Sequence, residues 1–314
     1  MQNSWDVIIV GGGSAGLSAA LMLGRSRRKV LVLDEGLPRN RFAGHMHGVL
    51  GRDHTSPLDL LAAGRTELRR YEGVVVRAGD VIAASAVERG FEVVLGDGER
   101  HEGRRMLVAT GLRDDLPPIP GLAEQWGRGA FICPYCDGWE QRDRRIAVLA
   151  TSEANTHQAQ LLRQLSPHVT FFGHGVDLSD AARAGLLARG IEIEERAVAA
   201  VVADEQGRLS GIRLADGTDA PADAIFVGPD PVPNDATLRA LGAETAAHPS
   251  GSDFVVVDEL GRTSVPGLWA AGNITDPRSS VPFAMAAGNM AGAAINADLI
   301  EDEVRDAVTA SAGA

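Results

Sequence analysis

A glycine-rich turn near the N-terminus constrains the fold more than any other feature of this sequence. An apolar run, Asp6-Val7-Ile8-Ile9-Val10, leads directly into Gly11-Gly12-Gly13-Ser14-Ala15-Gly16, and a helical pattern continues from Leu17. A continuous apolar strand is typical of a parallel sheet that is covered on both faces. The pattern G-x-G-x-x-G between such a strand and a helix is typical of a dinucleotide-binding βαβ unit.

Three glycines and one aspartate in this segment have the spacing that a bound dinucleotide requires. Gly11 permits the tight turn, Gly13 lets the backbone approach a pyrophosphate, and Gly16 allows the helix to pack closely on the strand. The free N–H groups at the start of the helix then face the phosphates. Asp34 closes the second strand about twenty residues later, where a carboxylate accepts ribose hydroxyls. The sequence therefore predicts a dinucleotide site on this turn.

Charge and hydropathy argue against two classes of partner. The formal net charge is −12 and no long Lys/Arg run occurs, so we expect neither nucleic acid nor an anionic membrane as a partner. No apolar stretch approaches the roughly 20 residues that a membrane-spanning helix needs. The chain enters its first strand within a few residues of the N-terminus, which leaves no room for a signal peptide. These features predict a cytoplasmic protein.

The rest of the chain alternates strand and helix patterns and contains two proline-rich crossings, at residues 116–121 and 228–234. The other predicted elements are a strand at 29–33, a hairpin-like pair at 74–76 and 91–95, a second βαβ pattern (strand 146–149, helix to about 165, strand 169–172), a strand-and-turn group at 211–227, a strand at 254–258 and a helix at 281–299. This layout predicts one dinucleotide-type domain interrupted by another, with the C-terminal segment returning to complete the first.

The only two cysteines, Cys133 and Cys136, form a C-x-x-C motif. In a reducing cytosol such a pair is more typical of a catalytic or metal site than of a structural disulfide. The spacing lets the two thiols form a disulfide without rearrangement of the chain. If a helix begins at the motif, its N-terminal dipole lowers a thiol pKa and makes thiolate available near neutral pH.

Two other interpretations of the motif remain open: a structural zinc site, and inert cysteines that cap a helix. A structural zinc ion needs four ligands, and the sequence has no second C-x-x-C. His157, His168 and His174 follow the motif, but their spacing does not indicate a zinc site. We therefore favour redox chemistry and predict no metal ion.

Two further stretches, residues 107–111 and 263–273, resemble the FAD-binding elements of flavoproteins with two dinucleotide-binding folds. Over nearly its whole length the chain resembles the low-molecular-weight thioredoxin reductase family. The resemblance implies an α/β fold of two Rossmann-like domains in three layers, the second inserted into the first. It assigns residues 1–115 and 246–314 to an FAD-binding domain. Residues 116–245 become an inserted NAD(P)H-domain-like redox domain that carries the C-x-x-C.

The resemblance also implies which residues hold FAD. In the family an aspartate at position 273 binds the ribityl chain, whereas Asn273 is uncharged and still accepts through its carbonyl oxygen. The N-terminal end of the last helix, near Phe283, points at the flavin in the family, where its dipole stabilises negative charge on the reduced ring. The implied FAD-binding residues are Gly11, Gly13, Ser14, Ala15, Gly16, Asp34, Arg39, Asn40, Ala109, Thr110, Gly111, Gly272, Asn273, Phe283 and Ala284.

By position, the family's chemistry carries over to the C-x-x-C segment. The resemblance implies that Cys136 faces the flavin, that Cys133 exchanges with the substrate, and that Asp137 exchanges protons with the thiol pair. His45 and His47 lie in a loop that passes near the flavin in the family, so either is a candidate base. We take His47 as the catalytic candidate; a merely solvated loop histidine is the alternative.

The second strand-to-helix turn, residues 150–155, lacks the glycines that a pyridine nucleotide requires. The resembled reductases bind NADPH on the inserted domain through a glycine-rich turn and a basic cluster for the 2′-phosphate. Here the turn contains Glu153, and the segment after the next strand, residues 173–177, has no arginine pair and includes Asp177. NADPH is therefore a doubtful ligand. The alternative is a degenerate loop that still binds it weakly.

The chain keeps the C-x-x-C pair but lacks the usual site for the electron donor NADPH. This combination favours electron flow from a substrate dithiol, through the C-x-x-C and FAD, to O₂, with H₂O₂ as product. The chain resembles the NADPH-independent dithiol oxidase branch of the family in Trp139 and in Cys133-Pro134-Tyr135-Cys136, although Asp137 departs from the histidine often found there. The alternatives are a disulfide reductase fed by NADPH, ferredoxin or another flavoprotein, and a flavin-binding redox sensor without turnover. The substrate would be a small-molecule dithiol or disulfide, or a thioredoxin-like protein. The resemblance also implies a homodimer.

Overall fold

The computed structural model describes residues 4–312, which form two compact units. The described residues of the first unit are 4–41, 58–113 and 231–312, and those of the second are 42–57 and 114–230. Two strands at the crossings, β7 (Leu112–Asp115) and β16 (Asp230–Pro233), pair with each other. The chain therefore leaves the first unit and returns to it through neighbouring strands.

The first unit is built on a seven-stranded sheet. Its strands are β1 (Ser4–Val10), β2 (Val30–Asp34), β3 (Val74–Ala78), β4 (Val81–Val87), β5 (Gly90–Leu95), β6 (Arg100–Val108) and β19 (Leu268–Ala270). Their order is β3-β2-β1-β6-β5-β4, and β19 pairs with the C-terminal half of β6. The strands β3, β2, β1, β6 and β19 run parallel, whereas β4, β5 and the N-terminal half of β6 are antiparallel. A separate antiparallel pair consists of β17 (Thr245–Ala247) and β18 (Asp253–Val255).

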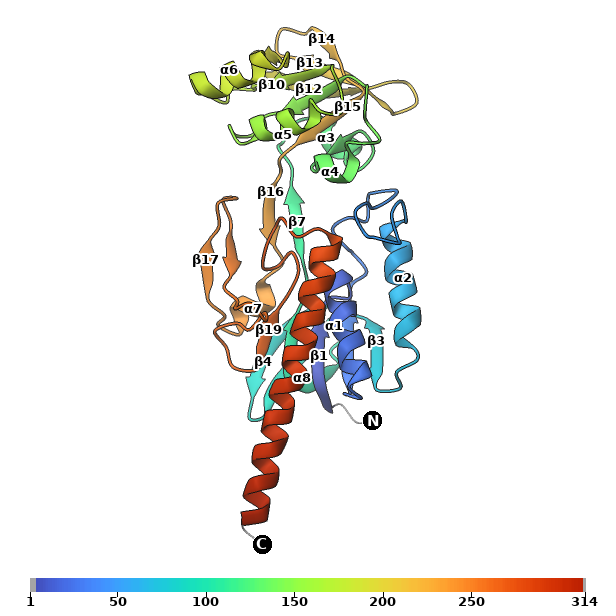
Figure 1. Cartoon of the computed structure of the whole chain (residues 1–314), viewed down its shortest axis with the longest axis vertical. Coiled ribbons are helices and arrows are strands. Elements are labelled where there is room, and N and C mark those ends of the chain that lie inside the picture. The colour runs from blue at the N-terminus through green and yellow to red at the C-terminus, as the bar shows by residue number, and fades with distance from the viewer. Residues whose placement is uncertain (1–3, 313–314) are drawn as a thin grey trace. The chain divides into compact units, whose positions relative to one another are not determined.

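Helices cover both faces of this sheet. Successive side chains of each strand point to opposite sides, so a continuous apolar strand places apolar side chains on both faces. The helices of the unit are α1 (Ser14–Arg25), α2 (Pro57–Leu68), α7 (Ala236–Ala240) and α8 (Val281–Ala312). Val7 and Ile9 pack with the apolar residues of α1, α2 and α8, whereas Ile8 and Val10 pack on the other side with α7. In Figure 1, α8 runs alongside α1. Gly288 permits this approach, because a Cβ there would overlap the backbone of Ala15.

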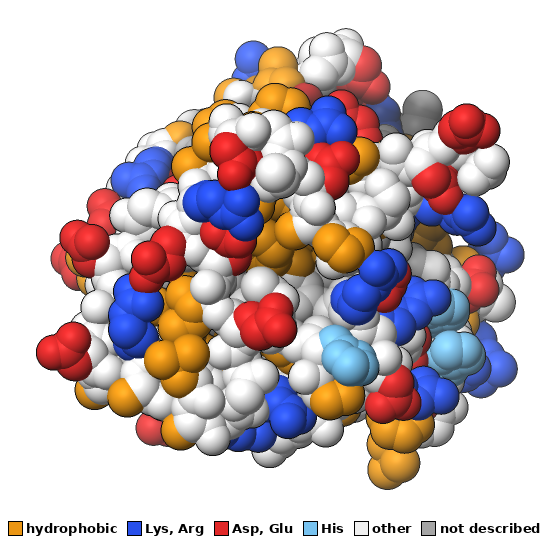
Figure 2. Space-filling view, turned by 90° about the horizontal axis from the view of Figure 1, so that it is seen from above, with side chains coloured by type: hydrophobic (Ala, Val, Ile, Leu, Met, Phe, Trp, Pro, Cys, Tyr) orange, Lys and Arg blue, Asp and Glu red, His pale blue; other side chains and the backbone are white. Residues whose placement is uncertain are grey.

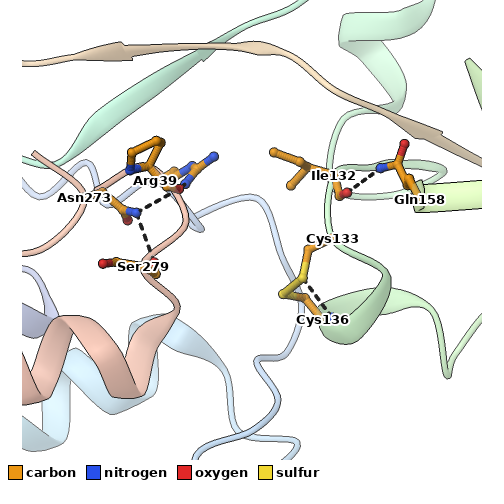
Figure 3. The surroundings of a disulfide bond; sticks show 8 residues. Arg39, Ile132, Cys133, Cys136, Gln158, Asn273 and Ser279 are labelled. Carbon is orange, nitrogen blue, oxygen red and sulfur yellow. Dashed lines mark hydrogen bonds between the residues drawn. A yellow bond between two sulfur atoms is a disulfide. The ribbon is translucent and has the colours of Figure 1, made fainter. Parts of the chain in front are cut away.

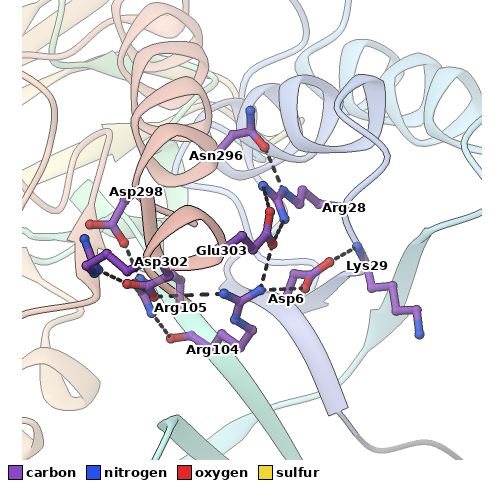
Figure 4. A network of polar contacts seen from close by, with 10 residues as sticks. Asp6, Arg28, Lys29, Arg104, Arg105, Asn296, Asp298, Asp302 and Glu303 are labelled. Atoms are coloured by element: carbon purple, nitrogen blue, oxygen red, sulfur yellow. Dashed lines mark hydrogen bonds and ion pairs between the residues drawn. The ribbon is translucent and has the colours of Figure 1, made fainter. Parts of the chain in front are cut away.

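Ion pairs attach the C-terminal half of α8 to the sheet (Figure 4). Arg105 of β6 contacts Asp298 over 2.5 Å and also contacts Asp302. Glu303 accepts from Arg28 over 2.5 Å and from Arg104 over 3.0 Å. Asp298 and Asp302 are 29% and 27% exposed, whereas Glu303 is 46% exposed, so solvent screens the ion pairs of Arg105 less than those of Glu303.

The second unit combines a parallel sheet with an antiparallel one. The parallel sheet consists of β8 (Ala130–Phe131), β9 (Ile146–Leu149), β10 (Val169–Phe172), β11 (Glu192–Glu194) and β15 (Ala224–Val227), in the order β11-β10-β9-β15-β8. The antiparallel sheet consists of β12 (Val198–Ala203), β13 (Leu209–Leu214) and β14 (Asp219–Pro221). The helices are α3 (Leu122–Gln125), α4 (Pro134–Asp137), α5 (Asn155–Leu162) and α6 (Asp180–Ala188). The four buried residues of β9 explain its continuous apolar sequence.

The predicted α/β architecture with two Rossmann-like folds is confirmed, with three local corrections. The hairpin-like pair is wrong: residues 74–76 lie in β3, which pairs in parallel with β2, and residues 91–95 lie in β5, which pairs with β4 and β6. The strand predicted at 254–258 ends at Val255, and the helix predicted at 281–299 continues to Ala312. An apolar run marks a strand, but the choice of its partner depends on the packing of the whole sheet.

The boundaries of the two units differ from those of the predicted domains. The chain re-enters the first unit at residue 231, whereas the prediction placed this return at 246. Leu238 of α7 explains the earlier return, because it is fully buried in the core of the first unit. Residues 42–57, which the prediction placed in the first domain, belong to the second unit.

The helices and one face of the surface bear on the predicted absence of membrane and nucleic-acid partners. None of the helices within residues 4–312 combines the length and the hydropathy that a membrane span requires. On the face seen in Figure 2, acidic, basic and apolar side chains are interspersed. The absence of a nucleic-acid partner and the cytoplasmic location stay predictions.

Candidate functional site

The glycine-rich turn joins β1 to α1 as the sequence predicts. Gly11 has a φ of 104°, a conformation that favours glycine. A Cβ at Gly11 would overlap the carbonyl group of Ala109, and one at Gly16 would overlap the carbonyl oxygen of Gly11. A Cβ at Gly13, in contrast, would meet no atom within 4 Å. The turn is therefore fixed by close backbone contacts on one side and is open at Gly13, where a pyrophosphate would approach.

Asp34 lies at the end of β2, beside the glycine-rich turn. Its Oδ1 accepts the N–H of Gly12 over 3.0 Å, and its Oδ2 contacts Arg65 Nη2 of α2 over 2.5 Å. A carboxylate has about four acceptor positions, so these two contacts leave capacity for ribose hydroxyls. Arg65 was missed by the sequence analysis, because no local pattern relates a helix residue to a strand end 31 positions earlier.

The segment after β6 is held by a second residue that the sequence analysis missed, Asn234. The hydroxyl of Thr110 donates to the Asn234 carbonyl oxygen over 2.8 Å, and the Asn234 side chain donates to the Thr110 carbonyl oxygen over 3.0 Å. Asn234 N–H also donates to the carbonyl oxygen of Gly111 over 3.0 Å. These bonds fix the backbone of Ala109-Thr110-Gly111 against the glycine-rich turn, where Ala109 contacts Gly11.

Asn273 acts as a donor in this structure. Its side-chain N–H groups lie 3.2, 3.2 and 3.0 Å from the carbonyl oxygens of Asp276, Pro277 and Ser279, as Figure 3 shows in part. Arg39 Nη1 also donates to the Pro277 carbonyl oxygen, over 2.9 Å. An aspartate could not make these bonds, because an ionised carboxylate only accepts. Asn273, which replaces the family's aspartate, therefore supplies the donor groups that the carbonyl oxygens of the loop before α8 require.

Of the remaining implied FAD residues, Gly272 and Ala284 lie beside Ala15 of the glycine-rich turn. Gly272 has a φ of 86° and a Cβ there would lie 3.0 Å from that of Ala15. Ala284 is buried at the start of α8, Phe283 is 70% exposed, and Asn40 is half-buried. All residues named for FAD thus belong to the first unit. Its open turn at Gly13, free helix N-terminus and acidic strand end fit a dinucleotide such as FAD.

Cys133 and Cys136 form a disulfide with a Cα–Cα distance of 5.2 Å, within the second unit. Cys133 is the N-cap of the short helix α4, and its sulfur accepts the N–H of Cys136 over 3.1 Å (Figure 3). The motif therefore opens a helix, which is the arrangement that makes a thiolate more available. On the same segment, Tyr135 and Trp139 are 80% and 62% exposed.

Asp137 is the last residue of α4 and follows the disulfide directly. Burial raises the pKa of its carboxyl group to about 6, the negative charge of Glu140 acts in the same direction, and His47 opposes them. A carboxyl group with this pKa exchanges protons near neutral pH, as an acid–base partner of a thiol pair must.

His47 belongs to the loop of residues 42–57 and lies beside the C-x-x-C segment. Its Nε2 is 3.4 Å from Glu140 Oε1, a distance in ion-pair range that does not meet hydrogen-bond geometry, and its Nδ1 is 3.3 Å from Asp53 Oδ1. The structure thus brings His47 into the second unit with Asp137 and the disulfide. His45 instead stacks on His54, with ring centroids 4.4 Å apart.

The second strand-to-helix turn is closed by its own side chains. Asn155 Oδ1 accepts the backbone N–H groups of Thr151 and Ser152 over 2.9 and 3.0 Å. The Thr151 hydroxyl donates to the carbonyl oxygen of Gly228 over 3.0 Å. Glu153 Oε1 accepts the hydroxyl and the N–H of Ser179, at the start of α6. An amide oxygen therefore occupies the donors that face a phosphate in a dinucleotide-binding turn.

The closed turn is linked to the disulfide segment by two glutamine contacts. Asn155 Nδ2 donates to Gln158 Oε1 over 3.2 Å, and Gln158 Nε2 donates to the carbonyl oxygen of Ile132 over 2.6 Å (Figure 3). Ile132 immediately precedes Cys133. Gln158 is a further residue that the sequence analysis missed, because its partner lies 26 positions away.

The chain is similar to several known proteins over nearly its whole length. Residues 5–291 match the family model described as pyridine nucleotide-disulphide oxidoreductase. The chain is 32% identical over 308 residues to thioredoxin reductase sirT of Leptosphaeria maculans, with 93% of each chain covered. Among solved structures, HlmI gives a TM-score of 0.93 at 40% identity and covers 99% of this chain and 98% of its own. An oxidoreductase from Agrobacterium tumefaciens gives 0.89 at 36% identity, with 96% and 99% covered.

Proposed function

The chain belongs to the pyridine nucleotide-disulphide oxidoreductase family as a thioredoxin reductase-like flavoprotein, and from this premise we propose that it oxidises a substrate dithiol to a disulfide with O₂ as acceptor. The observation that carries the direction of the reaction is the closed turn at Thr151 and Ser152. A pyridine nucleotide would have to displace Asn155 from both N–H groups before its pyrophosphate reached the backbone.

Charge and side-chain placement at both ends of this turn also argue against NADPH as the donor. Glu153 places a carboxylate on the turn, where it would repel a diphosphate. After β10, the His174 ring accepts the N–H of Val198 over 2.9 Å, so its Nδ1 is turned toward β12. The nearby Asp177 is exposed and adds a negative charge where a 2′-phosphate needs cations.

The proposed reaction moves two electrons and two protons from the substrate. One substrate thiolate attacks a sulfur of the Cys133–Cys136 disulfide, and the second substrate thiolate resolves the mixed disulfide, which leaves a substrate disulfide and a reduced cysteine pair. Asp137 takes up and returns the protons that this exchange moves. FAD, when bound, carries the two electrons from the cysteine pair to O₂, which is reduced to H₂O₂.

The substrate surface that we propose is the exposed aromatic flank of the disulfide. Tyr135 lies inside the motif and Trp139 one turn beyond it, and Arg142 stacks over the Trp139 ring at 4.4 Å. Exposed aromatic rings bind apolar or planar groups. This flank suits a small-molecule dithiol. The alternative substrate is a thioredoxin-like protein. An assay that contains both substrates shows which of the two the chain oxidises faster.

The deciding experiment is anaerobic mixing of the purified flavoprotein with dithiothreitol, NADPH or NADH, followed by flavin absorbance. We expect bleaching by dithiothreitol alone and about one H₂O₂ per dithiol when air is admitted, as the two-electron balance requires. A related NADPH-dependent reductase is the positive control for the nucleotide arm. Rapid bleaching by NADPH would refute the proposal. Cys136→Ser is expected to abolish the bleaching by dithiothreitol.

The second candidate is a disulfide reductase that receives electrons from ferredoxin, another flavoprotein or weakly bound NADPH. The retained Asp137 favours it, because a group with a pKa of about 6 can protonate a leaving thiolate. Reduction of a thioredoxin-like disulfide by the chain plus reduced ferredoxin would select this candidate. A third candidate, a redox sensor, predicts a single reduction without repeated turnover.

We also propose that the protein is a homodimer. Ile300, Val304 and Val308 are 46%, 55% and 64% exposed and lie four residues apart on α8. Apolar residues at this spacing form a stripe that a second helix can cover. Light scattering of the purified protein measures the mass directly, and a monomer at micromolar concentration would refute the dimer.

A further inference from the structure

Three histidines gather on the loop of residues 42–57, in the unit that also carries the disulfide. A short antiparallel bridge orders this loop: Met46 N–H donates to Thr55 over 2.8 Å, and His54 N–H donates back to Met46 over 3.0 Å. Met46 is buried and anchors the bridge. Its neighbours in sequence, His45 and His47, are thereby held opposite His54.

The three imidazole rings converge. One ring nitrogen from each of His45, His47 and His54 lies within 4.8 Å of the other two. Nitrogen ligands of a tetrahedral zinc ion are roughly 3.4 Å apart, as Zn–N bonds of about 2.1 Å require. His45 and His54 are exposed, so rotation of their side chains can open the present ring stack and close this difference.

His47 has the surroundings of a metal-ligating histidine. Asp53 Oδ1 lies 3.3 Å from His47 Nδ1 and is itself held by the N–H of Gly48 over 3.0 Å. A carboxylate behind a histidine ring in this manner orients ligating histidines and raises their basicity. The other nitrogen, Nε2, is buried and has no hydrogen-bond partner among the described residues, and Glu140 Oε1 is 3.4 Å from it.

In contrast to the sequence-based prediction of no metal ion, we propose that His45, His47 and His54 bind one divalent transition-metal ion, such as Zn²⁺, with Glu140 as a candidate fourth ligand. Imidazole nitrogens select ions of the zinc, copper and nickel type over Mg²⁺ and Ca²⁺, which prefer oxygen ligands. Asp53 and Glu140 supply two negative charges next to the ion. The site does not use the cysteine pair, so the proposal stands whichever way electrons flow through the disulfide.

The test is a calorimetric titration of the oxidised, FAD-loaded chain with Zn²⁺ after treatment with a chelator. Zn²⁺ is chosen because it has no redox chemistry, and the intact disulfide keeps thiolates from competing. We expect one saturable ion per chain. His45→Ala and His54→Asn are each expected to weaken binding at least tenfold, and Asp53→Asn to weaken it about tenfold. Asparagine is used at residue 54 because the φ of 64° there tolerates it.

His157→Ala is the matched control, because His157 is an exposed histidine of the same unit outside the cluster. It is expected to leave the affinity for Zn²⁺ unchanged. Tryptic cleavage after Arg52, an exposed residue of the loop, is expected to slow when Zn²⁺ is added to the unaltered chain but not to His54→Asn. No saturable binding, or equal losses in His45→Ala and His157→Ala, would overturn the proposal.

Discussion

Gln158 Nε2 donates a hydrogen bond of 2.6 Å to the carbonyl oxygen of Ile132, the residue that precedes the disulfide. Through Asn155, the same glutamine is joined to the turn where a second nucleotide would bind. The side chains that close the turn therefore also hold one end of the redox segment. In this chain, the closed turn therefore helps to position the disulfide through these hydrogen bonds.

Gln158→Ala is expected to slow the reduction of the disulfide by dithiothreitol about tenfold. The reason is that loss of one such hydrogen bond removes about 1–1.5 kcal/mol of the free energy that positions the disulfide segment. FAD content should not change, since every residue named for FAD lies in the other unit. Gln160→Ala is the matched control: Gln160 also donates to a backbone carbonyl, that of Gly185, over 3.0 Å. Denaturant unfolding should show similar losses of stability in the two variants. Stopped-flow bleaching of the flavin by dithiothreitol should be slower only in Gln158→Ala. Equal rates in the two variants would contradict the assigned role.

Asp137→Asn is expected to lower the rate of dithiol exchange by about 10²- to 10⁴-fold, the range for loss of a general acid–base group. In the unaltered chain the rate of dithiol oxidation should rise with pH through an inflection near 6, because the carboxylate accepts a substrate proton. Rates measured from pH 5 to 8 test this, with Asp143→Asn as a control carboxylate of the same unit. An unchanged inflection in Asp137→Asn would assign it to another group.

The same carboxyl group makes stability depend on pH. Because the pKa of Asp137 is raised to about 6 by burial, the folded chain holds this proton more tightly than the unfolded chain. Its contribution is therefore fully present below about pH 4, the usual pKa of Asp, and is lost as pH rises through 6. Denaturant unfolding at several pH values should show a smaller decrease over this window for Asp137→Asn. The same decrease in both proteins would refute the assignment.

Asn273→Asp, although it restores the residue usual in the family, is expected to lower FAD occupancy and to destabilise the first unit by about 1–3 kcal/mol. The reason is that three backbone carbonyl oxygens, those of Asp276, Pro277 and Ser279, would face a carboxylate in place of a donor. Asn296→Asp is the control, because Asn296 Oδ1 accepts from Arg28 over 2.7 Å and an aspartate keeps that role. Thermal unfolding and flavin content report both effects, and higher FAD affinity in Asn273→Asp would contradict the prediction.

Arg105→Met is expected to destabilise the first unit by about 1–3 kcal/mol, since it leaves Asp298 and Asp302 without their half-buried partner. Arg305→Met is the control: Arg305 is 66% exposed and pairs only at the surface with Asp302, where such a pair contributes about 0–1 kcal/mol. The free energy of unfolding in urea measures the difference. Similar losses in the two variants would show that burial of Arg105 is unimportant.

Local features were predicted well because their requirements are local. The spacing of Gly11, Gly13 and Gly16 is informative by itself, because each glycine meets a backbone requirement within one strand–turn–helix unit. The apolar run 146–149 likewise reads as a buried strand without reference to the rest of the chain. The hairpin at 74–76 and 91–95 failed for the complementary reason, because a strand's partner is not encoded in its own apolar pattern.

By itself, the sequence determined the two strand-to-helix turns, the acid at position 34 and the C-x-x-C spacing that allows Cys133 and Cys136 to pair. Only the tertiary structure decided the partners of the polar side chains: Arg65 on Asp34, Asn234 on Thr110, Gln158 on Ile132 and Glu140 beside His47. These residues are between 26 and 124 positions apart, and no periodicity spans such distances. A polar group takes whichever donor or acceptor the packing of distant elements brings to it, so its role appears only when the elements are assembled.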